Sequence, residues 1–234
     1  MAIVRKAPGP KSFGAVSTHR PVTSYRPLTA ARYRHPTWGY RVSKRLIDLV
    51  AVILATPLVL PVLLSAMALI KLESPGASVF FRQHRTGSNG ERFTLYKLRT
   101  MVPNAEELKK ELIKNNMLSW PDFKMENDPR ITRIGRFLRK SSIDELPQLY
   151  NVLIGEMSLV GPRPTSFESK TYKGWHTERL DVKPGITGLW QVMGRGRIDF
   201  DERVRLDIRY AKERSLWLDL KLLVMTVPAL LAGD

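Results

Sequence analysis

Residues 49–70, LVAVILATPLVLPVLLSAMALI, contain no charged side chain and consist mainly of Leu, Val, Ile and Ala. A helix of this length would measure about 33 Å at roughly 1.5 Å per residue, which is enough to cross a bilayer. Residues 1–40 precede it and are polar, whereas a cleaved signal peptide has only a short basic stretch before its apolar core. We therefore expect the segment to be retained in the protein and to enter a membrane.

Pro57 and Pro61 interrupt this apolar segment near its middle. Each proline removes a backbone donor and clashes with the preceding turn, at about 3 kcal/mol in an ordinary helix interior. Lys and Arg flank both ends of the segment, and the positive-inside rule favours the cytoplasmic side for Lys and Arg. The rule therefore gives no reason to place either end on the opposite side of the membrane. Residues 41–72 are predicted to form a re-entrant helix–break–helix in one leaflet, with Thr56 helping to satisfy backbone groups freed by Pro57. A kinked single span and a buried helix of a soluble protein are the alternatives.

Composition narrows the class of partner. The chain has 234 residues, enough to bury a core in one domain, and 38 Lys and Arg against 22 Asp and Glu give a net charge of +16. Such an excess favours nucleic acid, an anionic membrane surface or phosphate-bearing ligands. The chain has no cysteine, which excludes disulfides and cysteine nucleophiles. Residues 1–40 carry seven Lys or Arg and no acid, and are predicted to be a disordered tail that either binds headgroups or is an inert extension.

The stretch SSIDELPQLYNVLIGEMSLVGPRP, residues 141–164, contains two adjacent acids, Asp144 and Glu145. Five cations precede them, and no acid occurs between residues 129 and 143. The cations are Arg130, Arg133, Arg136, Arg139 and Lys140. Because nearby positive charge favours ionised carboxylates, we expect both acids to be available as nucleophile or metal ligand beside an anionic, phosphate-like partner.

An amphipathic helix is predicted after the acids, because apolar residues recur at i, i+3, i+4 and i+7. They are Leu146, Leu149, Tyr150 and Leu153. Proline is tolerated only in the first turn of a helix, so Pro147 places the start just before it and makes Asp144 the predicted N-cap. A cap would hold the carboxylate beside exposed backbone N–H groups, where phosphate also binds. The alternative is that Asp144 only caps the helix.

The remaining periodicity predicts two strands joined by a glycine-rich turn, three charged helices and a final apolar helix. The strands cover residues 79–83 and 92–99, and the helices cover residues 104–115, 132–140, 199–214 and 216–231. The final helix suits either the membrane interface or an ordinary core. The predicted fold class is therefore α/β and mostly helical: a compact cytosolic domain over residues 73–234, with a proline-broken re-entrant membrane helix and interfacial amphipathic helices.

Four motifs occur in order along the chain: the proline-broken segment, YKLRTM at 96–101, the stretch at 141–164, and KPGITGLWQVMGR at 183–195. Together they strongly resemble the bacterial sugar transferase family, the monotopic polyprenyl-phosphate phosphoglycosyl transferases, in its small exopolysaccharide-initiating type. The likeness covers about residues 40–230. It implies transfer of a sugar-1-phosphate, galactose or glucose favoured, from a UDP-sugar to undecaprenyl phosphate with release of UMP, as the first membrane step of exopolysaccharide biosynthesis.

The resemblance also implies roles for single residues. Asp144 would attack the sugar-linked phosphate to form a covalent phosphosugar intermediate and would lie beside Mg²⁺, the implied cofactor, while Glu145 would support the nucleophile or the metal. The implied contacts to phosphates or nucleotide are Lys97, Arg139, Pro162, Arg163, Arg195 and Asp207. Two of these have ordinary alternatives, because Lys97 could be a solvated strand lysine and Asp207 could pair with Arg203 on its own helix.

The implied location is the bacterial inner membrane, with monotopic topology and the active site on the cytoplasmic face. The implied partners are the UDP-sugar donor, the lipid acceptor and membrane lipids, without nucleic acid; a homodimer is left open. Direct transfer through a ternary complex is one alternative, with Asp144 as metal ligand only. A non-enzymatic, membrane-anchored basic binding or scaffold protein is the other, although the cation cluster lacks the interleaved aromatics of a single-strand platform.

Overall fold

The computed structural model describes residues 37–112, 125, 127–168, 171–172, 174–193 and 199–231. The predictions for the basic tail before residue 37 and for Arg195 lie outside these residues. The helices are α1 (Trp38–Glu73), α2 (Ala105–Leu112), α3 (Arg133–Lys140), α4 (Gln148–Ile154), α5 (Leu189–Met193), α6 (Phe200–Glu213) and α7 (Leu216–Leu231). Three 3-10 helices are η2 (Ser88–Gly90), η4 (Ile143–Glu145) and η6 (Gly174–Asp181). The strands are β1 (Phe80–Thr86), β2 (Arg92–Leu98), β3 (Ser158–Val160) and β4 (Gly185–Thr187). The mostly helical prediction is confirmed.

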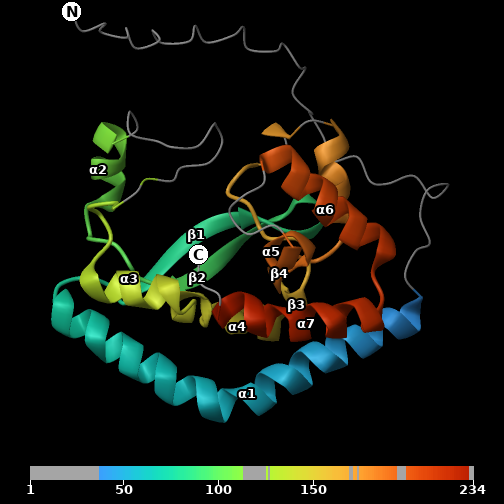
Figure 1. The fold of residues 1–234 in the computed structure, drawn as a ribbon, viewed down its shortest axis with the longest axis horizontal. Coiled ribbons are helices and arrows are strands. Elements are labelled where there is room, and N and C mark those ends of the chain that lie inside the picture. The colour runs from blue at the N-terminus through green and yellow to red at the C-terminus, as the bar shows by residue number, and fades with distance from the viewer. Residues whose placement is uncertain are drawn as a thin grey trace, which may run out of the picture.

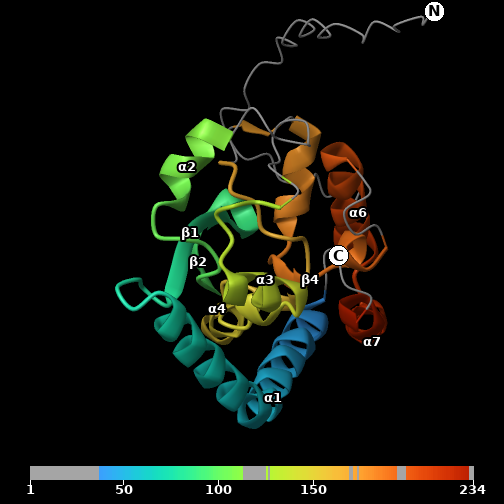
Figure 2. The same cartoon turned by 60° about the vertical axis from the view of Figure 1, so that its left-hand side comes forward.

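The apolar segment forms one continuous helix, α1, of 36 residues that contains both Pro57 and Pro61. It bends near its middle, so that both ends rise toward the rest of the domain (Figure 1). The second view shows the same angle, with α3 and α4 between the two halves (Figure 2). The predicted break is thus a bend. The Thr56 hydroxyl donates to the Val52 carbonyl at 2.8 Å, its own i−4 partner, and such back-bonding bends helices.

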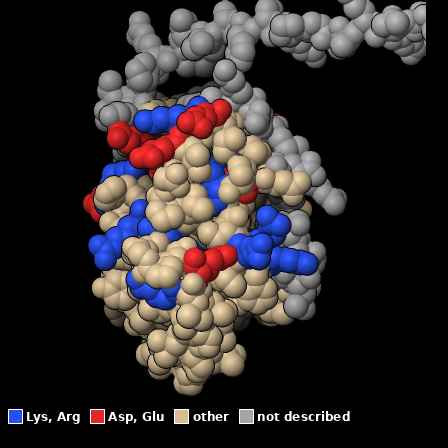
Figure 3. Space-filling view, turned by 90° about the vertical axis from the view of Figure 1, so that its left-hand side faces the viewer, with Lys and Arg blue, Asp and Glu red and all other residues tan. Residues whose placement is uncertain are grey.

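Most of α1 is exposed. Among the described residues it is the one helix long and apolar enough to cross a membrane, and large apolar side chains along it face outward, with Leu58 77% exposed. Figure 3 shows the lower tip of the molecule free of Lys, Arg, Asp and Glu on the face in view, with charged side chains above it. An exposed apolar surface of this extent does not suit the buried helix of a soluble protein and indicates membrane association.

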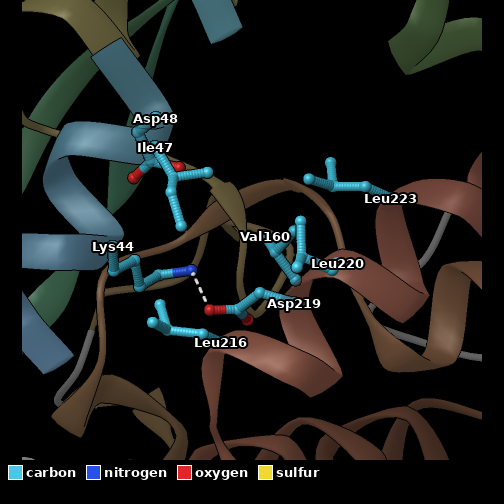
Figure 4. Close-up of a pocket in the computed structure, with 8 residues that line it drawn as sticks. All are labelled: Lys44, Ile47, Asp48, Val160, Leu216, Asp219, Leu220 and Leu223. Carbon is cyan, nitrogen blue, oxygen red and sulfur yellow. Dashed lines mark hydrogen bonds and ion pairs between the residues drawn. The ribbon is translucent and has the colours of Figure 1, made fainter. Parts of the chain in front are cut away.

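Charged side chains bind the N-terminal half of α1 to the domain. Lys44 donates to the Asp219 carboxylate of α7 at 2.9 Å, within a cluster of leucines from α7 (Figure 4). The Tyr210 hydroxyl of α6 donates to the other oxygen of Asp219 at 2.7 Å. Arg45 donates to the carbonyl of Leu153 at 2.6 Å, near the end of α4, where backbone carbonyls lack helical partners. The start of α1 therefore contacts α4, α6 and α7 through polar bonds.

The C-terminal end of α1 contacts α3 through one carboxylate. Glu73 accepts hydrogen bonds from the backbone N–H groups of Arg133 at 2.9 Å and Ile134 at 3.3 Å, in the first turn of α3. A negative charge is favourable there because these N–H groups have no partner within the helix. The Thr132 side chain caps the same helix by accepting from Gly135 N at 2.9 Å. The helix that leads to Asp144 is therefore fixed to the end of α1.

The two predicted strands form an antiparallel hairpin, β1 with β2, joined through Asn89, whose φ of 55° suits the turn. A second pair, β3 with β4, is parallel and joins two of the sequence motifs. Glycine permits this approach, since a Cβ on Gly161 would lie 2.3 Å from the Lys183 carbonyl oxygen, and one on Gly185 only 2.0 Å from Gly161 N. The GPRP stretch and the KPGITG stretch therefore lie backbone to backbone.

The charged helices predicted after the hairpin are confirmed as α2, α3 and α6, with residues 113–115 outside the described range. The helix after the acids is also present as α4, and only part of its predicted apolar side is buried: Leu149 packs against the core, and the buried side also carries Val152 and two polar residues. Tyr150 is 53% exposed and Leu153 is exposed, whereas Gln148 and Asn151 are buried. Asn151 donates to the Thr94 carbonyl of β2 at 2.7 Å, which accounts for its inward position. Part of the apolar surface of α4, and part of that of α7, therefore faces away from the core.

Candidate active site

The two acids lie in η4, between α3 and α4, so the predicted N-cap position of Asp144 is wrong. Ser142 has φ 57° and starts the turn, and the residue before α4 is Pro147. Within η4, Glu145 N donates to the Ser142 carbonyl at 3.2 Å, so this N–H group is used by the turn itself. The acids are therefore positioned by a short 3-10 turn that enters α4 through Pro147, and by the packing around it.

Glu145 is the centre of an ion-pair network. Lys97 of β2 donates to its Oε1 at 2.6 Å, and Arg163 of the GPRP stretch binds both oxygens, with Nη1 to Oε2 at 3.1 Å. Burial acts to raise the pKa of Glu145, but Arg163 and Lys97 outweigh it and hold that pKa well below its ordinary value. Glu145 is therefore ionised and brings cations from two distant motifs together.

Asp144 has the opposite electrostatic environment. Its side chain is buried, with the residue 8% exposed, and this burial raises its pKa above the ordinary value, with Glu145 adding to the effect. Lys97, Arg139 and Arg163 act in the other direction without reversing it. The expectation that neighbouring cations favour the ionised form of Asp144 is therefore wrong in net direction, because Glu145 already binds two of these cations and because burial dominates.

The arginine-rich cluster before the acids divides into separate contacts. The charge of Arg139 acts to lower the pKa of Asp144. Arg139 also donates from Nε to the Thr100 hydroxyl at 2.9 Å, and this bond joins α3 to the YKLRTM motif. Arg130 instead forms a buried ion pair with Asp128, Nη2 to Oδ2 at 2.6 Å. That acid lies one residue before the acid-free window of the sequence. The cations of this stretch therefore do not all project together.

The remaining predicted residues of the GPRP region have structural partners. Pro162 is buried, and its carbonyl accepts from Gly185 N at 2.9 Å. Asp207 is 1% exposed and binds the buried Arg179 of η6, rather than Arg203 of its own helix. Burial raises the pKa of Asp207 to about 6, against the opposing effect of Arg179. Asp207 is thus not placed at the surface where a ligand would meet Asp144.

Arg85 of β1 is a further cation of the site that the motifs did not indicate. Its Nη2 donates to Gln83 at 2.5 Å, while its Nε is buried and has no hydrogen-bond partner among the described residues. Burial, together with Arg163, lowers the pKa of Arg85 to about 10, and Glu145 opposes this. The two-residue alternation of β1, which turns Arg85 inward with Gln83, is the sequence signal that could have found it.

A metal ion at this site would need a phosphate ligand in addition to protein side chains. Among the described residues no three His, Asp or Glu side chains come together as a preformed site. Glu145 is engaged by Lys97 and Arg163, which leaves Asp144 as the one carboxylate of the pair without such a cation bound directly. Mg²⁺ commonly binds one or two carboxylates together with substrate phosphates and waters. The donor set fits an ion that arrives with a phosphate ligand.

Comparisons of this chain with a family model and with individual proteins agree on one family. A family model described as bacterial sugar transferase matches residues 39–233. The chain is 44% identical over 198 residues to the galactosyl transferase CpsE of Streptococcus agalactiae, which covers 84% of this chain and 44% of that protein. It is 44% identical over 199 residues to the undecaprenyl-phosphate galactose phosphotransferase of Salmonella typhimurium, covering 83% of this chain and 41% of that protein.

A third relative is matched over more of its length. The UDP-glucose:undecaprenyl-phosphate glucose-1-phosphate transferase of Caulobacter vibrioides is 44% identical over 210 residues, which covers 85% of this chain and 73% of that protein. By contrast, the chain spans less than half the length of the Streptococcus and Salmonella proteins. The matched region contains the bent helix and every site residue described above.

Proposed function

The chain belongs to the bacterial sugar transferase family, and on this premise we propose that it transfers a hexose-1-phosphate, galactose-1-phosphate or glucose-1-phosphate, from a UDP-sugar to undecaprenyl phosphate. The relatives' names support a sugar donor and this lipid carrier. The observation that carries the proposal is the position of Asp144, a buried carboxylate among Lys97, Arg139 and Arg163, in a turn connected through α3 to an exposed apolar helix.

In the first half-reaction, an oxygen of the Asp144 carboxylate attacks the phosphorus that carries the sugar. The new bond joins Asp144 to the sugar phosphate, and the bond to the bridging oxygen breaks, so that UMP leaves with that oxygen and its electron pair. The raised pKa of Asp144 is compatible with this role, because a carboxylate stripped of water is a better nucleophile than a solvated one.

In the second half-reaction, a phosphate oxygen of the lipid attacks the same phosphorus. The bond between phosphorus and Asp144 breaks, the carboxylate is regenerated, and the product is the lipid-linked diphosphate sugar. Both steps place extra negative charge on the equatorial oxygens, which Lys97, Arg163 and Arg85 are positioned to stabilise. The bidentate Arg163–Glu145 contact fixes the direction of one guanidinium before the substrate arrives.

Mg²⁺, when bound with the donor, would be held by Asp144 and the donor's phosphates and would offset the charge of the diphosphate. For the membrane, we propose that α1 enters one leaflet and returns, so that its bend lies in the hydrocarbon and both ends lie at the cytoplasmic face of the inner membrane. Exposed apolar side chains on α4 and α7 would lie at the same interface. The long lipid acceptor would then reach Asp144 without leaving the bilayer.

The test is UMP release by the full chain in nanodiscs with undecaprenyl phosphate and Mg²⁺, using UDP-galactose, UDP-glucose and their N-acetylated counterparts. Asp144→Asn is expected to lower kcat by at least about 10³-fold, as for loss of a nucleophile. Glu107→Gln, an exposed acid on α2, is the control expected to keep full activity. Full turnover by Asp144→Asn would contradict the proposal.

A second measurement separates the covalent route from a ternary complex. With UDP-sugar and labelled UMP but no lipid, the covalent route predicts label exchange into the UDP-sugar, since the first half-reaction is then complete and reversible. Direct transfer predicts no exchange until lipid is added. Exchange that persists in Asp144→Asn would show that another residue is the nucleophile.

A further inference from the structure

Both the side chain and the backbone of Arg163 form polar contacts. Its guanidinium binds Glu145, and its backbone carbonyl accepts a hydrogen bond from Nη2 of Arg179 at 2.6 Å. The same Nη2 also donates to the Asp207 carboxylate. Arg179 lies in η6 and is 4% exposed, while Asp207 lies in α6. A continuous chain of polar contacts therefore leads from α6 through η6 to the catalytic turn.

This buried pair is a costly way to join two helices. Removing two charges from water is expensive, and apolar residues of similar volume often stabilise a fold as well or better. The pair also leaves two of its own polar atoms unsatisfied, because Asp207 Oδ1 and Arg179 Nε have no hydrogen-bond partner among the described residues. One donor of Arg179 is instead directed at the Arg163 carbonyl, immediately before Pro164.

We propose that Arg179 and Asp207 are positioning residues: Asp207 orients the Arg179 guanidinium, and Arg179 fixes the Arg163 backbone so that the Arg163 side chain stays on Glu145. This inference rests on the proposed function, and it replaces a direct substrate contact for Asp207. A displacement of Arg163 would loosen a phosphate-binding cation and also release Glu145 from one of its two partners.

The decisive variant is Arg179→Met with Asp207→Val. It removes both buried charges together, so that neither charge is left unpaired, and it stays close to the combined volume of the two side chains. We expect it to retain the thermal midpoint within a few degrees and to lower kcat on the order of 10²-fold, the size of effect that follows from a misplacement of about 1 Å. The KM for undecaprenyl phosphate is expected to be unchanged.

Two further variants separate positioning from simple stability. Arg179→Lys retains a charge that can reach either partner and is expected to recover part of the lost kcat. Glu178→Gln with Lys212→Gln is the control, since that pair joins the same η6 and α6 but is partly exposed, with side chains 23% and 42% accessible. If kcat followed the thermal midpoint across all these variants, or if the double variant kept kcat within threefold of wild type, positioning would be wrong.

Hydrogen exchange provides a readout that does not need turnover. In the double variant, amides of residues 161–167 are expected to exchange about tenfold faster, whereas β1 and β2 keep their protection. The control pair is expected to leave residues 161–167 unchanged. A wild-type protein that released no UMP from any donor would refute the proposed function. Unchanged exchange at residues 161–167 in the double variant would refute the positioning role.

Discussion

Asp144 and Glu145 are neighbours in the chain, and the structure surrounds them differently. Glu145 receives Lys97 and Arg163 directly, while Asp144 is buried beside them. One acid is thereby strongly ionised and organises the cations, and the other is kept from water. Neighbouring carboxylates whose pKa values are shifted in opposite directions commonly have different roles in catalysis. We expect the chemistry to belong to Asp144 and the organisation to Glu145.

The first prediction concerns Glu145→Gln. Its lowered pKa means that the folded state holds this proton less tightly than the unfolded chain, so the ionised group adds stability above an unfolded pKa of about 4.3. That contribution is lost progressively as the pH falls below this value. At pH 7 the variant should be less stable by on the order of 3 kcal/mol, since two cations lose their partner. Thermal unfolding in detergent should show a difference that narrows below about pH 4.

A gap between wild type and Glu145→Gln that widened on acidification would contradict the direction of the pKa shift. Glu107→Gln provides the comparison, because that acid is exposed on α2 and its replacement is expected to change stability little. The comparison removes the general effect of acid on the remaining carboxylates.

The second prediction concerns Arg85. Replacing it with Gln removes a desolvated guanidinium whose Nε has no hydrogen-bond partner among the described residues. We expect the KM for the UDP-sugar to rise about tenfold, or about 1.4 kcal/mol, with the KM for the lipid less affected. Arg82→Gln on the same strand is the matched control, because Arg82 is exposed and lies over the Tyr96 ring. Equal effects in the two variants would refute a specific role for Arg85.

At the scale of elements, close backbone contacts at glycines join the sequence motifs. A Cβ on Gly135 of α3 would lie 2.1 Å from the Thr100 carbonyl oxygen, so α3 lies directly against the end of the YKLRTM motif. Gly161 and Gly185 make the corresponding contact between the other two motifs. These contacts explain why short motifs distant in sequence form one site.

The third prediction follows from Gly135. Gly135→Ala is expected to destabilise the protein by about 1–3 kcal/mol, because the backbone of α3 or of residue 100 must shift. Activity should fall as well, since Arg139 lies in the last turn of α3 and the turn with Asp144 follows this helix. Gly174→Ala is the control, because its Cβ would meet nothing within 4 Å. Circular dichroism melts and UMP release measure both effects, and equal melts for the two variants would contradict the argument.

Hydrophobic periodicity predicted the hairpin, α3 and α6, because one face of each packs against the hydrophobic core and the other face is exposed to water. The same rule was only partly right for α4, where Leu149 packs against the core but Asn151 faces β2 and Tyr150 is exposed. Side chains that face lipid and side chains that face a core are equally apolar, so spacing alone does not separate them. For α1, the prolines predicted a break, but the helix continues through both and bends near its middle.

At the scale of the whole molecule, both halves of α1 are bound to the domain, through Lys44 and Arg45 near its start and Glu73 at its end. The bent helix therefore has its two ends on one side (Figure 1). An unbent helix of this length would separate the two ends by about 1.5 Å per residue. A re-entrant topology follows from this shape if the bend lies in lipid.

The fourth prediction tests that topology. The chain has no cysteine, so Arg41→Cys and Gly76→Cys each introduce a unique label at an exposed end of α1. A membrane-impermeant maleimide is expected to label both from inverted vesicles and neither from intact spheroplasts. In Pro57→Leu with Pro61→Leu, a straighter helix is expected to place the two positions on opposite sides in part of the population. Labelling of either single position from outside in the otherwise unchanged chain would refute the re-entrant topology.

The sequence identified most of the residues that meet at the site, and it could not assign their partners. Asp144, Glu145 and Arg163 come from the motif at 141–164, Lys97 comes from the motif at 96–101, and the four lie together. Their pairing depends on which cation reaches which acid, and this requires tertiary distances. Arg85 was missed because it lies outside the four motifs, although the two-residue alternation of β1 places it on the same inward side as Gln83. The Asp207–Arg179 pair was not foreseen because the two residues are 28 positions apart on different helices.

The outward-facing apolar side chains of α4 and α7 have a practical consequence for preparing the protein. A shortened version that begins after Glu73 would still expose Tyr150, Leu153, Trp217 and Val224. It would also lose the carboxylate at the start of α3. Deleting α1 would therefore not yield a freely soluble fragment: the shortened chain would still need a surfactant belt, and without one it would precipitate through the same surface.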